Sequence, residues 1–236
     1  MNRTLRKYLA SAALALAAPV LSAQALIAYW DFNDEAVHDP LVNTPLSFAA
    51  NAGSQAAAAS LDTVLATTAS PHTYGIRAEG TTVNDIVNEP PVAGNAFSFT
   101  RGERSNGATL TVSFDASSVN LPVELSFAIN RIHANGVSQY QASYSTDGGD
   151  TFVDLGGSVD ITQGVWEAHT LDFGTVLSGA ADARVRLTFS GGNQVWSTDH
   201  RTNVDNVALI AIPEPRLYAA LFGLLALGFA VWRRRR

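Results

Sequence analysis

Apolar and polar side chains alternate through Val123-Glu124-Leu125-Ser126-Phe127-Ala128-Ile129-Asn130. Because successive side chains of a β-strand point to opposite faces, this period of two predicts a strand with one buried face. The same alternation recurs at residues 109–114 and 184–189. The second half of the chain is therefore predicted to consist of half-buried strands.

Further strands are predicted between turns rich in glycine, asparagine and aspartate, at residues 138–146, 151–155, 165–173 and 204–210. No amphipathic helix is evident among them. Many short strands at this spacing predict an all-β fold, an antiparallel β-sandwich of jelly-roll type. The conformation of residues 36–94 is not evident from the sequence.

The first 25 residues have the three parts of a secretory signal peptide. Arg3, Arg6 and Lys7 precede an apolar run at residues 8–20, and Ala23-Gln24-Ala25 supplies small residues around a cleavage position. The apolar run is shorter than the roughly 20 residues that a membrane-spanning helix needs. We therefore expect residues 1–25 to direct export through the Sec translocon and to be removed.

Residues 212–236 form a second distinct segment. Pro213-Glu214-Pro215 is followed by an apolar stretch at residues 217–232 and then by Arg233, Arg234, Arg235 and Arg236. The apolar stretch predicts one transmembrane helix of about 24 Å, and the arginines predict that its end stays cytoplasmic. Residues 26–211 are then a single ectodomain.

The order of these parts resembles the PEP-CTERM sorting signal of Gram-negative bacteria. The matching residues are Pro213, Glu214 and Pro215, the glycine-containing span and the arginine cluster. The resemblance implies transient anchoring in the inner membrane and recognition by exosortase, a membrane-embedded processing enzyme. It also implies delivery to the cell surface or the extracellular matrix. A plain tail anchor is the alternative.

Charge is distributed unevenly along the chain. The whole sequence has a formal net charge of −6, but the ectodomain keeps only seven arginines against 20 carboxylates, a formal charge of −13. Such a surface repels phosphates, which argues against a nucleic-acid partner. The chain contains no cysteine, so thiolate catalysis and cysteine-bound zinc are excluded.

Two stretches at the ends of the ectodomain, residues 27–34 and 203–209, are similar to the terminal strands of calcium-containing carbohydrate-binding modules and MAM-type adhesion domains. The resemblance implies neighbouring terminal strands and a structural calcium held by Asp31, Asp34 and Asp205. Alternation also places Asp205 on the face of Val207 and Leu209, so its carboxylate needs a buried partner. A backbone-capping role or an arginine partner for Asp205 stays open.

Aromatic residues are candidates for sugar contacts, because an aromatic ring packs against the apolar face of a pyranose. Trp166 begins a predicted strand, Trp196 lies in a polar stretch before the last strand, and Tyr140 lies within a strand. Burial in the core is the alternative for each of them. We expect ligand contacts from Trp196, Trp166 and Tyr140.

No catalytic constellation is evident. Residues 145–152 match the Asp-box pattern of sialidase-like propellers, but one copy in this chain predicts only a hairpin turn. The five histidines show no metal-ligand spacing, and neither a G-x-S-x-G elbow nor a phosphate loop is present.

These observations favour an exported, non-enzymatic protein of the cell surface or biofilm matrix that functions in adhesion or exopolysaccharide binding. A secreted polysaccharide hydrolase is one alternative, since an acidic chain contains many carboxylate pairs. A purely structural matrix component is another.

Overall fold

The computed structural model describes residues 24–38, 42, 44–64, 74–88, 90–193, 197–212, 228 and 233. Leu26–Ala211 form a compact unit. Most of the predicted signal peptide, the Pro213-Glu214-Pro215 motif and most of the predicted transmembrane segment lie outside the described residues. Among the residues that are described, no helix has the length and apolar character needed to cross a membrane.

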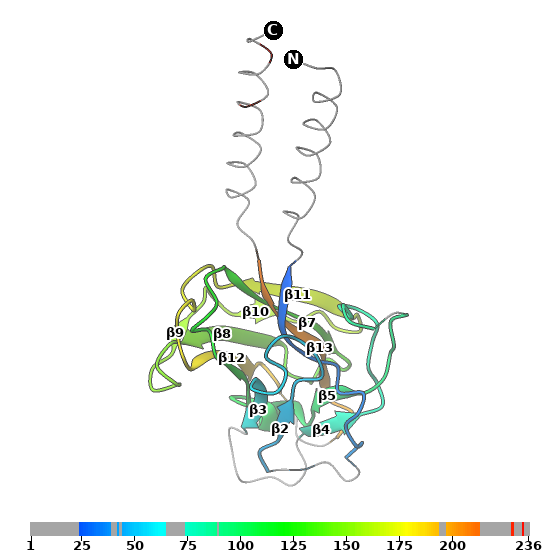
Figure 1. Cartoon of the computed structure of the whole chain (residues 1–236). Helices are drawn as coiled ribbons and strands as arrows, with labels where there is room; N and C mark the ends of the chain where they lie inside the picture. The colour runs from blue at the N-terminus through cyan, green and yellow to red at the C-terminus, as the bar shows by residue number, and fades with distance from the viewer. Residues whose placement is uncertain are drawn as a thin grey trace. The chain divides into compact units, whose positions relative to one another are not determined.

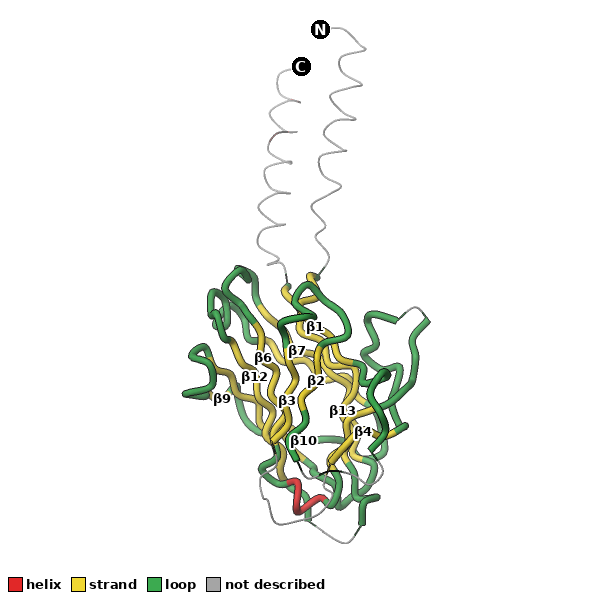
Figure 2. Tube along the Cα trace, turned by 60° about the horizontal axis from the view of Figure 1, so that its bottom comes forward, coloured by secondary structure: helices red, strands yellow, loops and turns green. Residues whose placement is uncertain are grey.

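Two β-sheets build the compact unit (Figures 1 and 2). Sheet 1 has the strand order β11-β7-β13-β5-β4, with β1 also paired to β13. Sheet 2 has the order β10-β8-β12-β6-β3-β2, with β9 also paired to β8. The elements are β1 (Ala25–Trp30), β2 (Ser47–Ala49), β3 (Ser60–Val64), β4 (Tyr74–Arg77), β5 (Ala96–Phe99), the 3-10 helix η2 (Gly102–Ser105), β6 (Thr109–Phe114), β7 (Val123–Arg131), β8 (Gln139–Ser145), β9 (Val153–Asp154), β10 (Val159–Asp160), β11 (Glu167–Asp172), β12 (Ala183–Ser190) and β13 (Thr202–Ala211).

The alternating stretches of the sequence form inner strands of both sheets. In sheet 1, β7 pairs antiparallel with β11 and β13, and in sheet 2, β12 pairs antiparallel with β6 and β8. Every second residue of β6 and of β12 is buried. The predicted all-β, antiparallel sandwich is confirmed.

The hydrophobic core lies between the sheets. Phe99 of β5 packs on Phe189 of β12 with ring centroids 4.2 Å apart, and Phe127 of β7 packs on Tyr140 of β8 at 5.4 Å. Burial of one such side chain stabilises the fold by about 1.5–3 kcal/mol. Because the inner faces form the core, ligand contacts are left to the outer faces, the sheet edges and the connecting loops.

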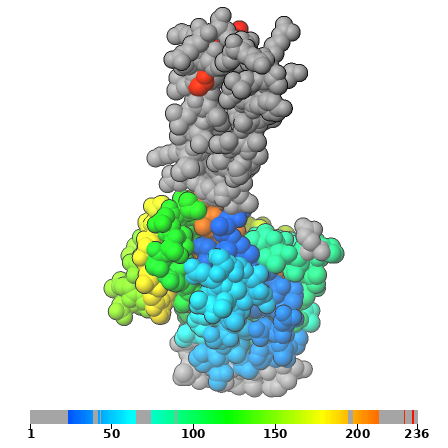
Figure 3. All heavy atoms as spheres, in the orientation of Figure 1, coloured from blue at the N-terminus to red at the C-terminus, as the bar shows by residue number. Residues whose placement is uncertain are grey.

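Two features of sheet 1 position the candidate site. The first and last strands, β1 and β13, pair with each other, which agrees with the neighbouring terminal strands that the resemblance implied. Residues 78–88 and 90–95 belong to the β4–β5 loop, which lies at the surface and is coloured turquoise in Figure 3. The β4–β5 loop supplies residues to both clusters described below.

Candidate functional site

The outer face of sheet 1, turned away from sheet 2, carries a row of small and polar residues. The strand registers place Gly75 opposite Ser98, Ser98 opposite Asn203, and Asn203 opposite Asn130. Most of their neighbours along the strands belong to the core, so these four residues lie on the other face. We call Gly75, Ser98, Asn203 and Asn130 the polar row.

Glu79 of the β4–β5 loop contacts the middle of the polar row. Ser98 Oγ donates to Asn203 Oδ1 at 2.6 Å, and Asn203 Nδ2 donates to Glu79 Oε2 at 3.3 Å. Glu79 Oε1 also forms an ion pair with the Arg201 guanidinium at 2.7 Å. Both partners are partly exposed, so the ion pair contributes at most about 1 kcal/mol to stability. Its main effect is to fix a carboxylate and a guanidinium beside the row.

Several buried polar atoms near the row have no hydrogen-bond partner among the described residues. They are Asn130 Oδ1, Arg131 Nε, Arg201 Nε and His200 Nδ1. A buried polar atom without a partner costs roughly 1–3 kcal/mol, and native proteins contain few of them. Asn130 and Arg201 share the face of the polar row, whereas Arg131 alternates with Asn130 along β7 and turns to the opposite face.

Trp166 lies beside the polar row at the edge of sheet 1. β11 begins at Glu167, and its exposed Ala168 is paired with Ala128 on the outer face. Extending this register by one residue places Trp166 opposite Asn130 on the same face. The indole is partly exposed. The polar row and Trp166 span five neighbouring strands, so together they extend over about 19 Å, the length of a short oligosaccharide.

Two histidine rings stack at the same end of the sheet. The ring centroids of His133 and His200 are 4.3 Å apart and the rings are inclined by 28°. His133 is exposed, and its Nδ1 accepts a hydrogen bond from the Asn135 N–H at 3.2 Å. The stacked rings add a flat surface near Arg201.

The three predicted ligand contacts differ in their positions. By extension of the β7–β11 register Trp166 belongs to the outer face of sheet 1, and Trp196 lies outside the described residues. The prediction for Tyr140 needs correction, because its ring is 1% exposed in the core and its hydroxyl is 2.8 Å from His169 Nδ1. Alternation along β8 turns Tyr140 inward, so the ring offers no face to a ligand.

Asp205 is buried, as expected, but on the opposite face of β13. It is 1% exposed, and its register partner Ala128 lies on the outer face of sheet 1. The register shifts between Asp205 and Ala208, where Asn206 adopts a left-handed φ of 49°. This β-bulge adds one residue to the strand, so Val207 is in the core while Asp205 is not.

Backbone N–H groups satisfy both carboxylate oxygens of Asp205. The Thr81 N–H donates to Oδ2 and the Asn206 N–H donates to Oδ1, each at 2.8 Å. Burial raises the pKa of Asp205 to about 8, and the negative charges of Asp31 and Asp85 also act to raise it. The two hydrogen bonds act to lower this pKa but are outweighed. The carboxyl group of Asp205 therefore takes up a proton at a higher pH than an exposed aspartate does.

Tyr29 links β1 to this buried cluster. Its Oη lies 2.7 Å from Asn206 Oδ1 and 3.0 Å from Asp85 Oδ1, and its single proton is shared between the two acceptors. Burial and then Asp85 raise the pKa of Tyr29. Burial also acts to raise the pKa of Asp85, but the N–H groups of Asn88 and Val92 outweigh it and lower that pKa. Asp85 was not predicted, because its segment shows no periodicity.

The geometry does not fit the predicted calcium ligands. Asp34 is exposed in the turn after β1, and Asp31 Oδ1 accepts the Asn33 N–H at 3.1 Å. Calcium needs oxygen atoms that converge on one point, whereas N–H groups point at the oxygens of Asp31 and Asp205. In the part of the chain that the structure describes, no three His, Cys, Asp or Glu side chains are placed to hold a metal ion.

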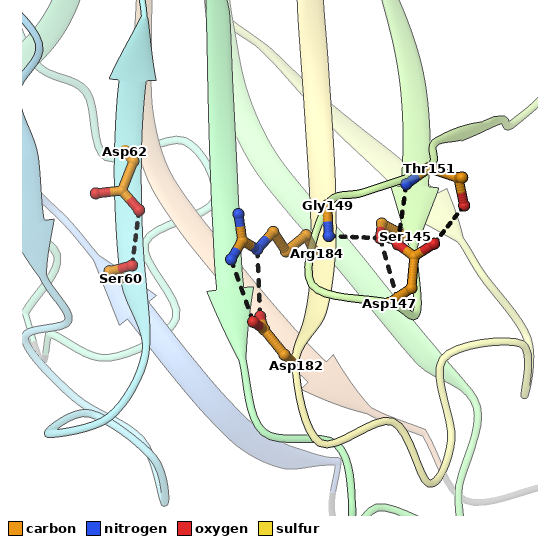
Figure 4. A network of polar contacts seen from close by, with 8 residues as sticks. All are labelled: Ser60, Asp62, Ser145, Asp147, Gly149, Thr151, Asp182 and Arg184. Carbon is orange, nitrogen blue, oxygen red and sulfur yellow. Dashed lines mark hydrogen bonds and ion pairs between the residues drawn. The ribbon is translucent and has the colours of Figure 1, made fainter.

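The Asp box forms the turn between β8 and β9 (Figure 4). Asp147 accepts hydrogen bonds from the Ser145 hydroxyl at 2.6 Å and from the Thr151 N–H at 3.0 Å, which lower its pKa. Gly148 and Gly149 both have positive φ, which glycine adopts without strain. The predicted hairpin turn is confirmed.

Comparison with known proteins assigns no family. No family model matches the chain, and no curated protein does. The CBM22-1 xylan-binding domain of Paenibacillus barcinonensis Xyn10C is similar over 82% of this chain and 99% of that chain, with 9% identity and a TM-score of 0.44. The K1 cleaved adhesin domain of Lys-gingipain from Porphyromonas gingivalis W83 is similar over 72% and 99%, with 15% identity and a TM-score of 0.43. Values this low carry no argument about function.

Proposed function

We propose that this chain is exported and that its sandwich binds a neutral polysaccharide through the outer face of sheet 1. The main support is the buried Asn130 Oδ1, which has no partner among the described residues and lies beside Trp166. Sugar recognition combines hydrogen bonds to hydroxyl groups with stacking on an aromatic ring. Glu79 and Arg201 add a hydrogen-bond acceptor and a donor at the border of the same row.

The charge of the ectodomain indicates which polysaccharides would bind. A formal charge of −13 repels polymers rich in uronate, sulfate or phosphate groups. Arg201 is a cation at the polar row, and Glu79 already pairs with it. A ligand without charge avoids both the repulsion and the cost of breaking this pair.

A binding experiment with residues 26–211 tests the proposal. Affinity electrophoresis in gels that contain neutral or anionic polysaccharides is expected to retard the domain only in neutral ones. Trp166→Ala is expected to weaken binding roughly two- to tenfold, because loss of aromatic stacking costs about 0.5–1.5 kcal/mol. Val165→Ala is the matched control, since Val165 is a neighbouring residue that is 51% exposed and has no ring. Equal mobility of the folded domain in every gel would contradict the proposal.

We further propose that both ends of the chain are sorting signals. Residues 1–25 would engage the Sec translocon. Exosortase would then recognise Pro213-Glu214-Pro215 together with Arg233 to Arg236, before the processed protein is released to the surface or the matrix. Mass spectrometry of the native protein is expected to show a mature N-terminus near Leu26 and loss of the arginine cluster. Recovery of the whole chain from Met1 to Arg236 would refute this.

A hydrolase remains the second candidate because of one carboxylate pair. Asp172 of β11 lies directly opposite Glu124 of β7, and burial together with the charge of Asp172 raises the pKa of Glu124. A carboxyl group of raised pKa that faces a second carboxyl group is a pattern found in glycoside hydrolases. Release of reducing ends that Glu124→Gln abolishes would favour this function over binding alone.

A further inference from the structure

The side-chain amide of Asn88 lies between two carboxylates. Its Nδ2 is 3.3 Å from Asp31 Oδ2 and 3.2 Å from each carboxylate oxygen of Asp85. Asn88 and Asp85 belong to the β4–β5 loop, whereas Asp31 directly follows β1. One NH2 group therefore ties the loop to the first strand.

The neighbours determine which end of the Asn88 amide faces inward. All three nearby atoms are carboxylate oxygens, which accept hydrogen bonds, so the NH2 end must face them. The reversed amide would place its own oxygen against these acceptors. The backbone N–H of Asn88 also donates to Asp85 Oδ1 at 3.0 Å, so the residue contacts Asp85 twice.

A second amide holds the same loop to the last strand. Asn206 Nδ2 donates to the Thr81 carbonyl at 2.7 Å and to the Val83 carbonyl at 2.9 Å. In return, Asn84 Nδ2 donates to the Asn206 carbonyl at 2.7 Å. Asn206 adopts a left-handed φ, an uncommon conformation that asparagine tolerates better than most residues do. This φ belongs to the β-bulge, and the side chain of Asn206 reaches the loop from there.

We infer that the amides of Asn88 and Asn206 lock the β4–β5 loop onto the paired terminal strands, in the role that the resemblance assigned to a structural calcium. Calcium binds six to eight oxygen atoms at about 2.3–2.6 Å. At this junction the carboxylate oxygens receive N–H groups instead, including one NH2 group between Asp31 and Asp85. The junction is therefore independent of metal.

Thermal unfolding of the full chain in mild detergent tests the inference. The melting temperature of the unchanged protein is expected to be the same in EDTA and in excess calcium. Asn88→Asp replaces the bridging amide by a third carboxylate, so this variant is expected to melt lower in EDTA and to recover when calcium is added. The control Asn120→Asp adds the same charge at an exposed turn and is expected to show no calcium response.

Terbium luminescence provides a second measurement, because Tyr29 lies next to the cluster and would sensitise a bound lanthanide. Only Asn88→Asp is expected to give a saturable signal. A lower melting temperature of the unchanged protein in EDTA, or saturable terbium binding by it, would overturn the inference. So would an Asn88→Asp variant that ignores calcium. No glycan enters either measurement, so their outcome is independent of the proposed binding function.

Discussion

Replacement of Asp205 by asparagine measures the effect of burying one carboxyl group under the β4–β5 loop. The pKa of Asp205 is about 8 in the folded protein and about 3.9 in an unfolded chain. Between these values the folded state keeps a proton that the unfolded state releases. The stabilisation is complete below about pH 4 and is lost as the pH rises through about 8. Each pH unit in this window lowers the free energy of unfolding by up to about 1.4 kcal/mol.

The asparagine variant removes this pH dependence because its side chain has no charge. Its single carbonyl oxygen keeps one of the two hydrogen bonds from Thr81 and Asn206, and loss of the other costs about 1 kcal/mol. At pH 7 the loss of stability in the wild type, relative to pH 4, reaches at most about 4 kcal/mol. We therefore expect the variant to be less stable than the wild type at pH 4 and more stable at pH 8.

Urea unfolding of residues 26–211 between pH 4 and pH 9, followed by tryptophan fluorescence, checks this prediction. The difference in stability between variant and wild type cancels the titration of groups that do not interact with Asp205. Asp182→Asn is the control, since Asp182 forms an exposed ion pair with Arg184. A difference for Asp205→Asn that stays constant with pH would refute the reasoning.

Two further predictions concern the loops. Gly80→Ala would place a Cβ 2.7 Å from the Asn95 carbonyl oxygen and 2.8 Å from Asp205 Oδ2, so urea unfolding is expected to show a loss of about 1–3 kcal/mol. Gly157→Ala, where nothing lies within 4 Å, should be neutral, and equal effects of both changes would speak against close packing of the loop. Asp147→Ala removes the hydrogen-bond acceptor of the Asp-box turn, so hydrogen exchange is expected to accelerate at residues 149–151. Polysaccharide binding is expected to stay unchanged. A loss of binding would indicate that the binding site includes this turn and not the outer face of sheet 1 alone.

Alternation predicted the strands well because it reflects a local requirement, the burial of one face. The stretches at residues 109–114, 123–130 and 184–189 are the strands β6, β7 and most of β12. Tyr140 follows the same rule, since it shares the inner face of β8 with Ala142. The expected ligand contact of Tyr140 is wrong, because this alternation turns its ring into the core.

The candidate site depends on contacts that periodicity does not encode. Thr81 and Asp205 are 124 positions apart in the sequence, and Tyr29 and Asn206 are 177 apart. The bulge at Asn206 reverses the face on which Asp205 lies, and no apolar pattern marks it. Likewise, alternation assigns a residue to a face but does not say which strands are neighbours, so the polar row emerges only from the registers.

A hydrogen-exchange footprint shows whether the outer face of sheet 1 contacts the ligand. Residues 26–211 would be compared with and without a saturating neutral oligosaccharide. We expect slower exchange at residues 130–133, 166–168 and 201–203, with no change at residues 184–188 of sheet 2. Slower exchange confined to sheet 2 would contradict this prediction.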